Sequence, residues 1–225
     1  MIQGQKIKNE IEKIGETLIK DDNYKNYPDL VCDQRKGIIP RGLLYEYGER
    51  DLSGTGSVIV GLNPGQSKKD EREYFKKAFK EHRLKYQTHV DFWNGKYRNW
   101  KYHNRLRSVS DRLGLKGPIL WTELVKCESK KQGQLRVQTV RDDIHKYLLK
   151  EISCIPESWP LIAAGDKAYE ILSYSFPNRL VVGVPHPTGT RGNHWTNHIN
   201  IRKIKKLKRV IRRGKPIAIH TKDIE

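Results

Sequence analysis

The sequence has few cysteines, no long apolar run and a final quarter almost free of acidic residues. The first two shortages argue against a disulfide-stabilised protein and against a membrane-spanning one. Its three cysteines are scattered over 225 residues without a Cys-x-x-Cys pair, which argues against a disulfide framework and favours a reducing compartment. No apolar run could span a bilayer, and the first residues carry charges throughout, unlike a signal peptide. We therefore expect a soluble cytoplasmic protein without a membrane contact.

The charge is strongly positive and unevenly distributed. Lys and Arg number 44 against 26 Asp and Glu, which gives a formal net charge of +18. No acidic residue occurs from 171 to 222, and nine basic residues lie between Arg202 and Lys215. Such an excess can simply keep a protein soluble, but its concentration in one segment is typical of a protein that binds DNA. The basic residues that we expect to contact phosphates are Arg202, Lys205, Lys208, Arg209 and Arg212.

The apolar pattern predicts an α/β fold. Apolar residues at steps of three and four predict a helix over residues 5–20, and the turn-rich stretch 21–56 should wrap the core. Four short runs rich in Val, Ile and Leu follow at residues 57–62, 118–125, 159–164 and 179–185, and helical patterns lie between them at residues 102–113, 140–152 and 166–174. Because these runs are apolar throughout, they predict strands of a parallel sheet covered on both faces.

A last amphipathic helix is predicted over residues 197–213, with Gly214 and Pro216 to end it. We therefore expect one domain with three parts: an N-terminal helix and wrapping loops (1–56), an α/β core (57–195), and a basic C-terminal helix and tail (196–225). Ligands of parallel sheets bind at the carboxyl ends of the strands, where Asn63, Glu123 and His186 fall.

Four strand-end motifs carry a resemblance to a known family. They are VIVGLNPG (58–65), ILWTELVKC (119–127), LIAAGDKAYEIL (161–172) and VVGVPHPTGTRG (181–192). In this order they resemble the uracil-DNA glycosylase superfamily over about residues 57–195, with the Gly-x-Asn-Pro-Gly form of its mismatch-specific and single-strand-selective branches. The resemblance implies a three-layer α/β/α sandwich around a four-stranded parallel sheet. It also implies a monomeric, monofunctional DNA glycosylase that needs no cofactor or metal.

By this resemblance, Asn63 orients a water toward the sugar C1′, and His186 donates a hydrogen bond to the base O2 as negative charge develops there. Gly61 and Leu62 would line the base site. Phe75 would stack on the extruded base, although it can equally be a core residue, with Tyr74 as a competitor for that role.

The loop after His186 would enter the duplex and fill the space that the base leaves. It comprises Thr188, Gly189, Thr190 and Arg191, of which Arg191 has the longest reach. Lys126 is the lysine nearest to a strand-end motif, and we expect no strand-cleaving lyase step. Some branches of the family hold an iron–sulfur cluster, but only Cys127 lies at a matching place. Since Cys32 has no close partner in the sequence, we expect no cluster.

Glu123 departs from the family pattern, in which an Asn often reads the pairing edge of the base. A carboxylate only accepts hydrogen bonds, so it would repel uracil O4 and suit the exocyclic amine of a cytosine. Alternatively, Glu123 is protonated in a dry pocket, or it points away from the base. We therefore expect a modified, 5-substituted cytosine as the substrate, as in antiviral defence. The alternatives are a uracil or mismatch glycosylase of base-excision repair, a non-catalytic DNA-binding module, and an unrelated α/β enzyme acting on a free nucleotide.

Overall fold

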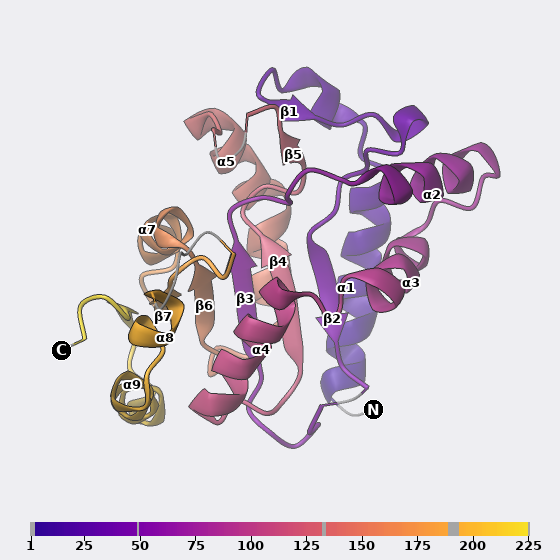
Figure 1. Ribbon diagram of the computed structural model, residues 1–225. Coiled ribbons are helices and arrows are strands. Elements are labelled where there is room, and N and C mark those ends of the chain that lie inside the picture. Colours follow the sequence, from indigo (N-terminus) through magenta and orange to yellow (C-terminus); the bar gives the residue numbers. More distant parts are fainter. Residues whose placement is uncertain (1–2, 49, 132–133, 189–193, 225) are drawn as a thin grey trace. The chain divides into compact units, whose positions relative to one another are not determined.

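The computed structural model describes residues 3–48, 50–131, 134–188 and 194–224 (Figure 1). The chain forms two compact units, each assembled from separate stretches. Unit 1 comprises residues 1–44, 63–98 and 122–155, and unit 2 comprises residues 45–62, 99–121 and 156–225. The expected Gly189, Thr190 and Arg191 of the duplex-entering loop lie outside the described residues.

The fold is mixed α/β with a mostly parallel sheet of six strands in the order β2-β4-β3-β6-β7-β8. The four-strand count expected above is therefore wrong. The four predicted strands are β3 (Ser57–Gly61), β4 (Ile119–Glu123), β6 (Leu161–Ala164) and β7 (Leu180–Val184). The two additional edge strands are β2 (Leu43–Glu46) and β8 (Ile217–His220). These two lack a long apolar run, and β8 is largely exposed, so the apolar pattern did not reveal them.

Three strands of unit 2 end at the same edge of the sheet. Within the parallel ladder, Val60 pairs with Ala163, and Ala164 pairs with Val184. Strands β3, β6 and β7 therefore end in one row, and the segments that begin at Leu62, Gly165 and Pro185 leave the sheet at this edge. Every residue of β3 and β6 is buried, which explains their uninterrupted apolar runs.

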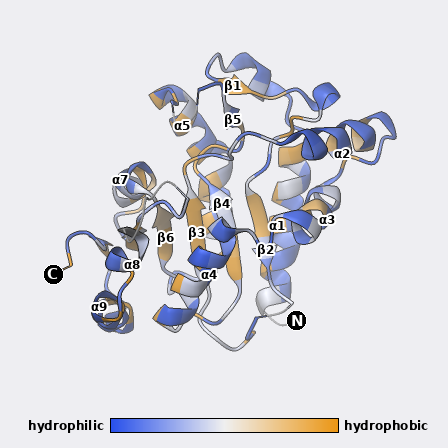
Figure 2. Cartoon of the chain, in the orientation of Figure 1, coloured by the Kyte–Doolittle hydropathy of each residue, from blue (hydrophilic) through white to orange (hydrophobic). Residues whose placement is uncertain are grey.

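The helices of unit 2 follow the predicted pattern except near the C-terminus. Helix α4 (Lys101–Leu113) contacts α9 (Ile201–Arg213), and α7 (Asp166–Ser175) packs against β6 and β7. The helix predicted over 197–213 is divided into α8 (His194–His198) and α9. The division lies at Asn200, whose side chain caps α9 by accepting a hydrogen bond from Lys203 N at 2.9 Å. As predicted, α9 ends at Gly214, which adopts the left-handed conformation. Figure 2 shows β3 in hydrophobic colours and α9 mainly in hydrophilic ones.

Unit 1 is mainly helical. Helix α1 (Gln3–Ile19) packs against α3 (Tyr86–Lys96), where a Cβ on Gly15 would come within 2.2 Å of the Tyr86 ring. The other helices are α2 (Lys69–Lys80), α5 (Val137–Asp143) and α6 (Leu149–Ser153), with a π-helical turn (Ile144–Leu148) between the last two. Two short strands, β1 (Leu30–Val31) and β5 (Glu128–Ser129), pair antiparallel. No helix within the described ranges has both the length and the apolarity that a membrane span requires.

Candidate active site

Asn63 directly follows the β3 segment, and its side-chain amide is held by acceptors from unit 1. Its Nδ2 donates to the carbonyl oxygens of Pro64 at 3.1 Å and Cys127 at 3.4 Å, and to Ser129 Oγ at 3.4 Å. Its Oδ1 accepts no hydrogen bond from the part of the chain that the structure describes. An amide held in this way presents its carbonyl oxygen in a defined direction. It can therefore accept a hydrogen bond from a water and orient that water.

A buried arginine holds the backbone that follows this amide. Arg41 donates to Glu128 Oε1 at 2.8 Å and to the carbonyl oxygen of Gly65, and it forms an ion pair with Glu71 at 3.3 Å. The backbone N–H of Ser67 donates to the same Glu128 oxygen at 2.9 Å. Both carboxylates and the arginine side chain are almost completely buried, so these charge-assisted bonds are protected from water. The backbone turn that follows Asn63 is thus held by hydrogen bonds at Gly65 and at Ser67.

Glu123, at the end of β4, has a buried carboxyl oxygen, Oε2, without a hydrogen-bond partner in the described chain. It lies beside Gly42, whose φ is +90°: a Cβ there would be 2.6 Å from Glu123 Cγ and 3.4 Å from Pro64 Cγ. Burial raises the pKa of Glu123 to about 8, although Lys126 and Arg41 act in the opposite direction. At neutral pH the carboxyl group is therefore protonated, and it can both donate and accept a hydrogen bond.

This protonation state corresponds to one of the alternatives given for Glu123 above. A protonated acid donates as well as accepts, so it differs from the acceptor-only carboxylate considered above.

Phe75 has no exposed surface. Its ring lies 5.2 Å from that of Phe92 and 6.2 Å from that of His89, and the Tyr74 ring meets it edge-on at 5.3 Å. The ring therefore has no open face on which a base could stack, and the structure corresponds to the core alternative rather than the stacking role. Tyr74, the competitor, is 39% exposed.

His186, in unit 2, follows β7, and its neighbours determine where the imidazole carries its proton. Thr188 N donates to Nδ1 at 3.4 Å, and Thr188 Oγ1 lies 3.3 Å from the same nitrogen. A ring that accepts at Nδ1 carries its proton on Nε2 when neutral. Partial desolvation by neighbouring atoms lowers the pKa of His186, although part of its surface is exposed, and this favours the neutral ring. Nε2–H is then the ring's hydrogen-bond donor.

Helix α4 supports the loop that carries this histidine. The Tyr102 ring lies 5.6 Å from the His186 ring. Arg105 donates to the carbonyl oxygen of Pro187, and its guanidinium lies 5.3 Å above the Trp195 ring. Sequence analysis missed Tyr102 and Arg105, as it missed Arg41, because nothing local distinguishes them from other residues of their type.

The basic residues of α9 form a stripe in unit 2. Arg202, Lys205, Arg209 and Arg212 are spaced by three and four residues and are exposed, whereas Lys208 is half-buried. The opposite face buries Ile204 and Leu207. The residues that pack α9 against the protein are therefore on a different face of the helix from the basic stripe.

Two further expectations concern buried groups of unit 1. Lys126 is completely buried and donates to Glu151 Oε2 at 2.9 Å and to Thr122 Oγ1, so it serves an internal ion pair. Cys32 has no close partner in the sequence, but in the fold its thiol interacts with that of Cys127 and contributes to the raised pKa of Cys127. Antiparallel pairing of two segments distant in sequence brings the two cysteines together.

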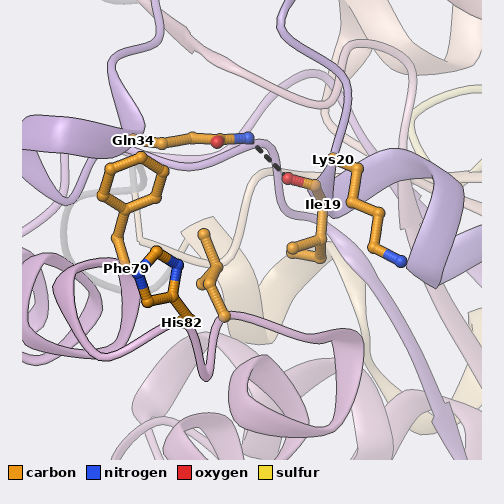
Figure 3. A pocket seen from close by; sticks show the side chains of 6 residues that line it. Ile19, Lys20, Gln34, Phe79 and His82 are labelled. Carbon is orange, nitrogen blue, oxygen red and sulfur yellow. Dashed lines mark hydrogen bonds between the residues drawn. The ribbon is translucent and has the colours of Figure 1, made fainter.

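No cluster of three metal-ligating side chains occurs within the described ranges. A hollow of about 240 Å³ lies in unit 1 (Figure 3) and contains none of the predicted site residues. Gln34 Nε2 donates to the carbonyl oxygen of Ile19 at its wall, at 2.6 Å. The residues that line the hollow are Ile19, Lys20, Gln34, Phe79, His82 and Leu84.

In comparisons with known proteins, no family model matches the chain, and neither does any curated protein.

Proposed function

We propose that the protein is a monofunctional DNA glycosylase on an α/β/α sandwich similar to that of uracil-DNA glycosylases. It flips a pyrimidine out of DNA and hydrolyses the N-glycosidic bond. The observation that carries the proposal is the arrangement of Asn63 after a buried parallel strand, with its amide N–H groups bonded to protein and its carbonyl oxygen left to accept.

The chemistry requires two groups at opposite ends of the breaking bond. As the C1′–N bond breaks, positive charge develops on the sugar and negative charge on the base. Asn63 Oδ1 orients the water that attacks C1′, and because an amide is not a base at neutral pH, it acts by positioning. His186 Nε2–H donates to the base O2, where it stabilises the departing anion. The proposal requires both side chains to act on one nucleotide.

Glu123 can pair with a cytosine-type base in either protonation state. Its carboxyl group can accept a hydrogen bond from the N4 amine in either protonation state, and when protonated it can also donate to N3. Uracil is matched only by the protonated form, since a carboxylate would repel O4. The protonated form matches both bases, and uracil is disfavoured only as Glu123 ionises. Within the proposal we take a 5-substituted cytosine, as in modified viral DNA, as the substrate. A role in antiviral defence follows from that choice, and a role in base-excision repair would follow from uracil.

Duplex DNA would be held through its phosphates by the α9 stripe. Replacing Arg202, Arg209 and Arg212 by Glu should weaken DNA binding strongly, reduce its salt dependence and leave base choice unchanged. Fluorescence anisotropy at several salt concentrations measures both effects. The matched control reverses three exposed charges of unit 1: Lys6 and Lys13 of α1, and Lys20, which follows that helix. Equal weakening by the two triple variants would show that only net charge matters.

The test of catalysis is base release from duplexes that contain uracil, a G·T mismatch, cytosine or a 5-substituted cytosine. Asn63→Ala should lower release at least about 100-fold while DNA affinity is kept. Asn94→Ala, on the exposed surface of α3, is the control and should match the wild type. If the wild type binds DNA but releases no base, the protein is a DNA-binding module. If uracil is released faster than every cytosine derivative, the substrate is uracil, as in base-excision repair, and not a modified cytosine.

A further inference from the structure

Strands β1 and β5 of unit 1 pair antiparallel (Figure 1), and a cysteine lies next to each of them in the sequence. The printed pairs of this antiparallel ladder are Leu30 with Ser129 and Val31 with Glu128. One further step in the same register places Cys32 opposite Cys127. The two residues are far apart in the sequence, so only the ladder brings them together.

The hydrogen-bond pattern of the ladder makes this pair a close one. Lys130 N donates to the carbonyl oxygen of Asp29 at 2.8 Å, which makes Asp29 and Lys130 a hydrogen-bonded pair. Bonded and non-bonded pairs alternate along an antiparallel ladder, so the next position in this register, Cys32 with Cys127, is that of a non-bonded pair, for which Cα atoms lie about 4.5 Å apart. Disulfides span about 4.4 to 6.8 Å between Cα atoms, so the two sulfurs can join with little movement of the backbone.

The two thiols differ in access. Cys127 has no exposed surface, whereas Cys32 is partly exposed. Burial, followed by the hydrogen bond with Cys32, raises the pKa of the Cys127 thiol. Both thiols are free in the structure. Cys32 is therefore the thiol that an oxidant meets first, and Cys127 is placed to react with the product.

We propose that Cys32 and Cys127 form a reversible disulfide in response to hydroperoxides, and that this bridge controls the amide of Asn63. Hydrogen peroxide oxidises the Cys32 thiol to a sulfenic acid and leaves as water. The Cys127 sulfur then attacks the Cys32 sulfur, the S–S bond forms, and the expelled hydroxide takes the Cys127 proton as a second water. Two thiols lose two electrons in total, and a thiol reductant restores them.

The connection to Asn63 runs through the backbone of Cys127 and rests on the proposed function. The Cys127 carbonyl oxygen and Ser129 Oγ each accept from Asn63 Nδ2 at 3.4 Å, near the upper limit for a hydrogen bond. A shift of a few tenths of an ångström on bridge formation is enough to break these two bonds and to leave the amide held by the Pro64 carbonyl oxygen alone. The oxidised protein should therefore release bases more slowly than the reduced one.

The experiment treats the reduced full-length protein with hydrogen peroxide, alkylates the remaining thiols and maps the peptides by mass spectrometry. We expect one cross-link, between Cys32 and Cys127, with Cys154 alkylated. Because the bridge closes a long loop, Tm should rise by about 10 °C and return after treatment with dithiothreitol. Cys154→Ser should behave like the wild type, and Cys32→Ser should show neither the cross-link nor the rise in Tm.

Sulfinic acid at Cys32 beside a reduced Cys127, or a bridge that involves Cys154, would overturn the proposal. A bridge that leaves the rate of base release unchanged would overturn the control of Asn63. If the reduced protein releases no base at all, the glycosylase function fails, while the peptide map still decides whether the disulfide forms.

Discussion

The protonated Glu123 gives a prediction about stability that needs no substrate. Its folded pKa of about 8 lies above the ordinary value of 4.5, so the folded protein keeps a proton that the unfolded chain loses. Stability should therefore fall as the pH rises between these two values. The isosteric variant Glu123→Gln cannot ionise and lacks this loss. Its stability relative to the wild type should thus increase with pH.

The size of the effect follows from linkage. Each pH unit costs the wild type about 1.4 kcal/mol while the group is ionised only in the unfolded chain. Between pH 6.5 and pH 8 the difference between the two proteins should change by about 1.5 kcal/mol, because the slope flattens as the folded group begins to ionise. This corresponds to a change of about 5 °C in the difference between their Tm values. Contributions from other groups, such as Asp143, whose pKa burial raises to about 6, cancel in the difference.

Urea unfolding at pH 5, 6.5, 8 and 9 measures the free energy of unfolding of both proteins. Glu73→Gln is the matched control, because it removes a carboxyl group from an exposed position of α2. A constant difference between the wild type and Glu123→Gln across this range would refute the reasoning. The Glu123 carboxyl group would then be ionised at neutral pH. As a carboxylate it would accept a hydrogen bond from a cytosine N4 amine and repel uracil O4.

Three further substitutions test the buried groups of unit 1 by urea unfolding. Arg41→Met should destabilise the protein by about 3–5 kcal/mol because it leaves buried carboxylates without a counter-charge, and a loss below about 1 kcal/mol would contradict that role. Lys126→Met should lower the free energy of unfolding by a similar amount, and adding Glu151→Leu should restore most of that loss. If the double variant is no more stable than Lys126→Met, the role of Lys126 is not to pair with Glu151. Phe75→Ala should cost about 3–5 kcal/mol and Tyr74→Ala much less, whereas a Phe75 variant that folds normally but loses base release would restore the stacking role.

The sequence alone predicted the regular core because its signals are local. The strands β3, β4, β6 and β7 are short apolar runs, and a residue's neighbours in the chain are enough to reveal such a run. Helices α1, α4 and α7 were predicted from apolar spacing and confirmed, and so was the glycine end of α9. The positions of Asn63 and His186 after strand ends follow from the same pattern, since each side chain comes directly after a buried run.

The tertiary structure decided the properties that depend on neighbours distant in the sequence. Burial raises the pKa of Glu123, whose side chain lies beside Gly42, and a change in solvation has no signature in the local sequence. Phe75 became a core residue through the rings packed around it. Cys32 and Cys127 are 95 residues apart in the sequence, and the antiparallel pairing of β1 with β5 brings their segments together. Burial and strand pairing are cooperative properties of the folded chain, so they appear only when the whole chain has packed.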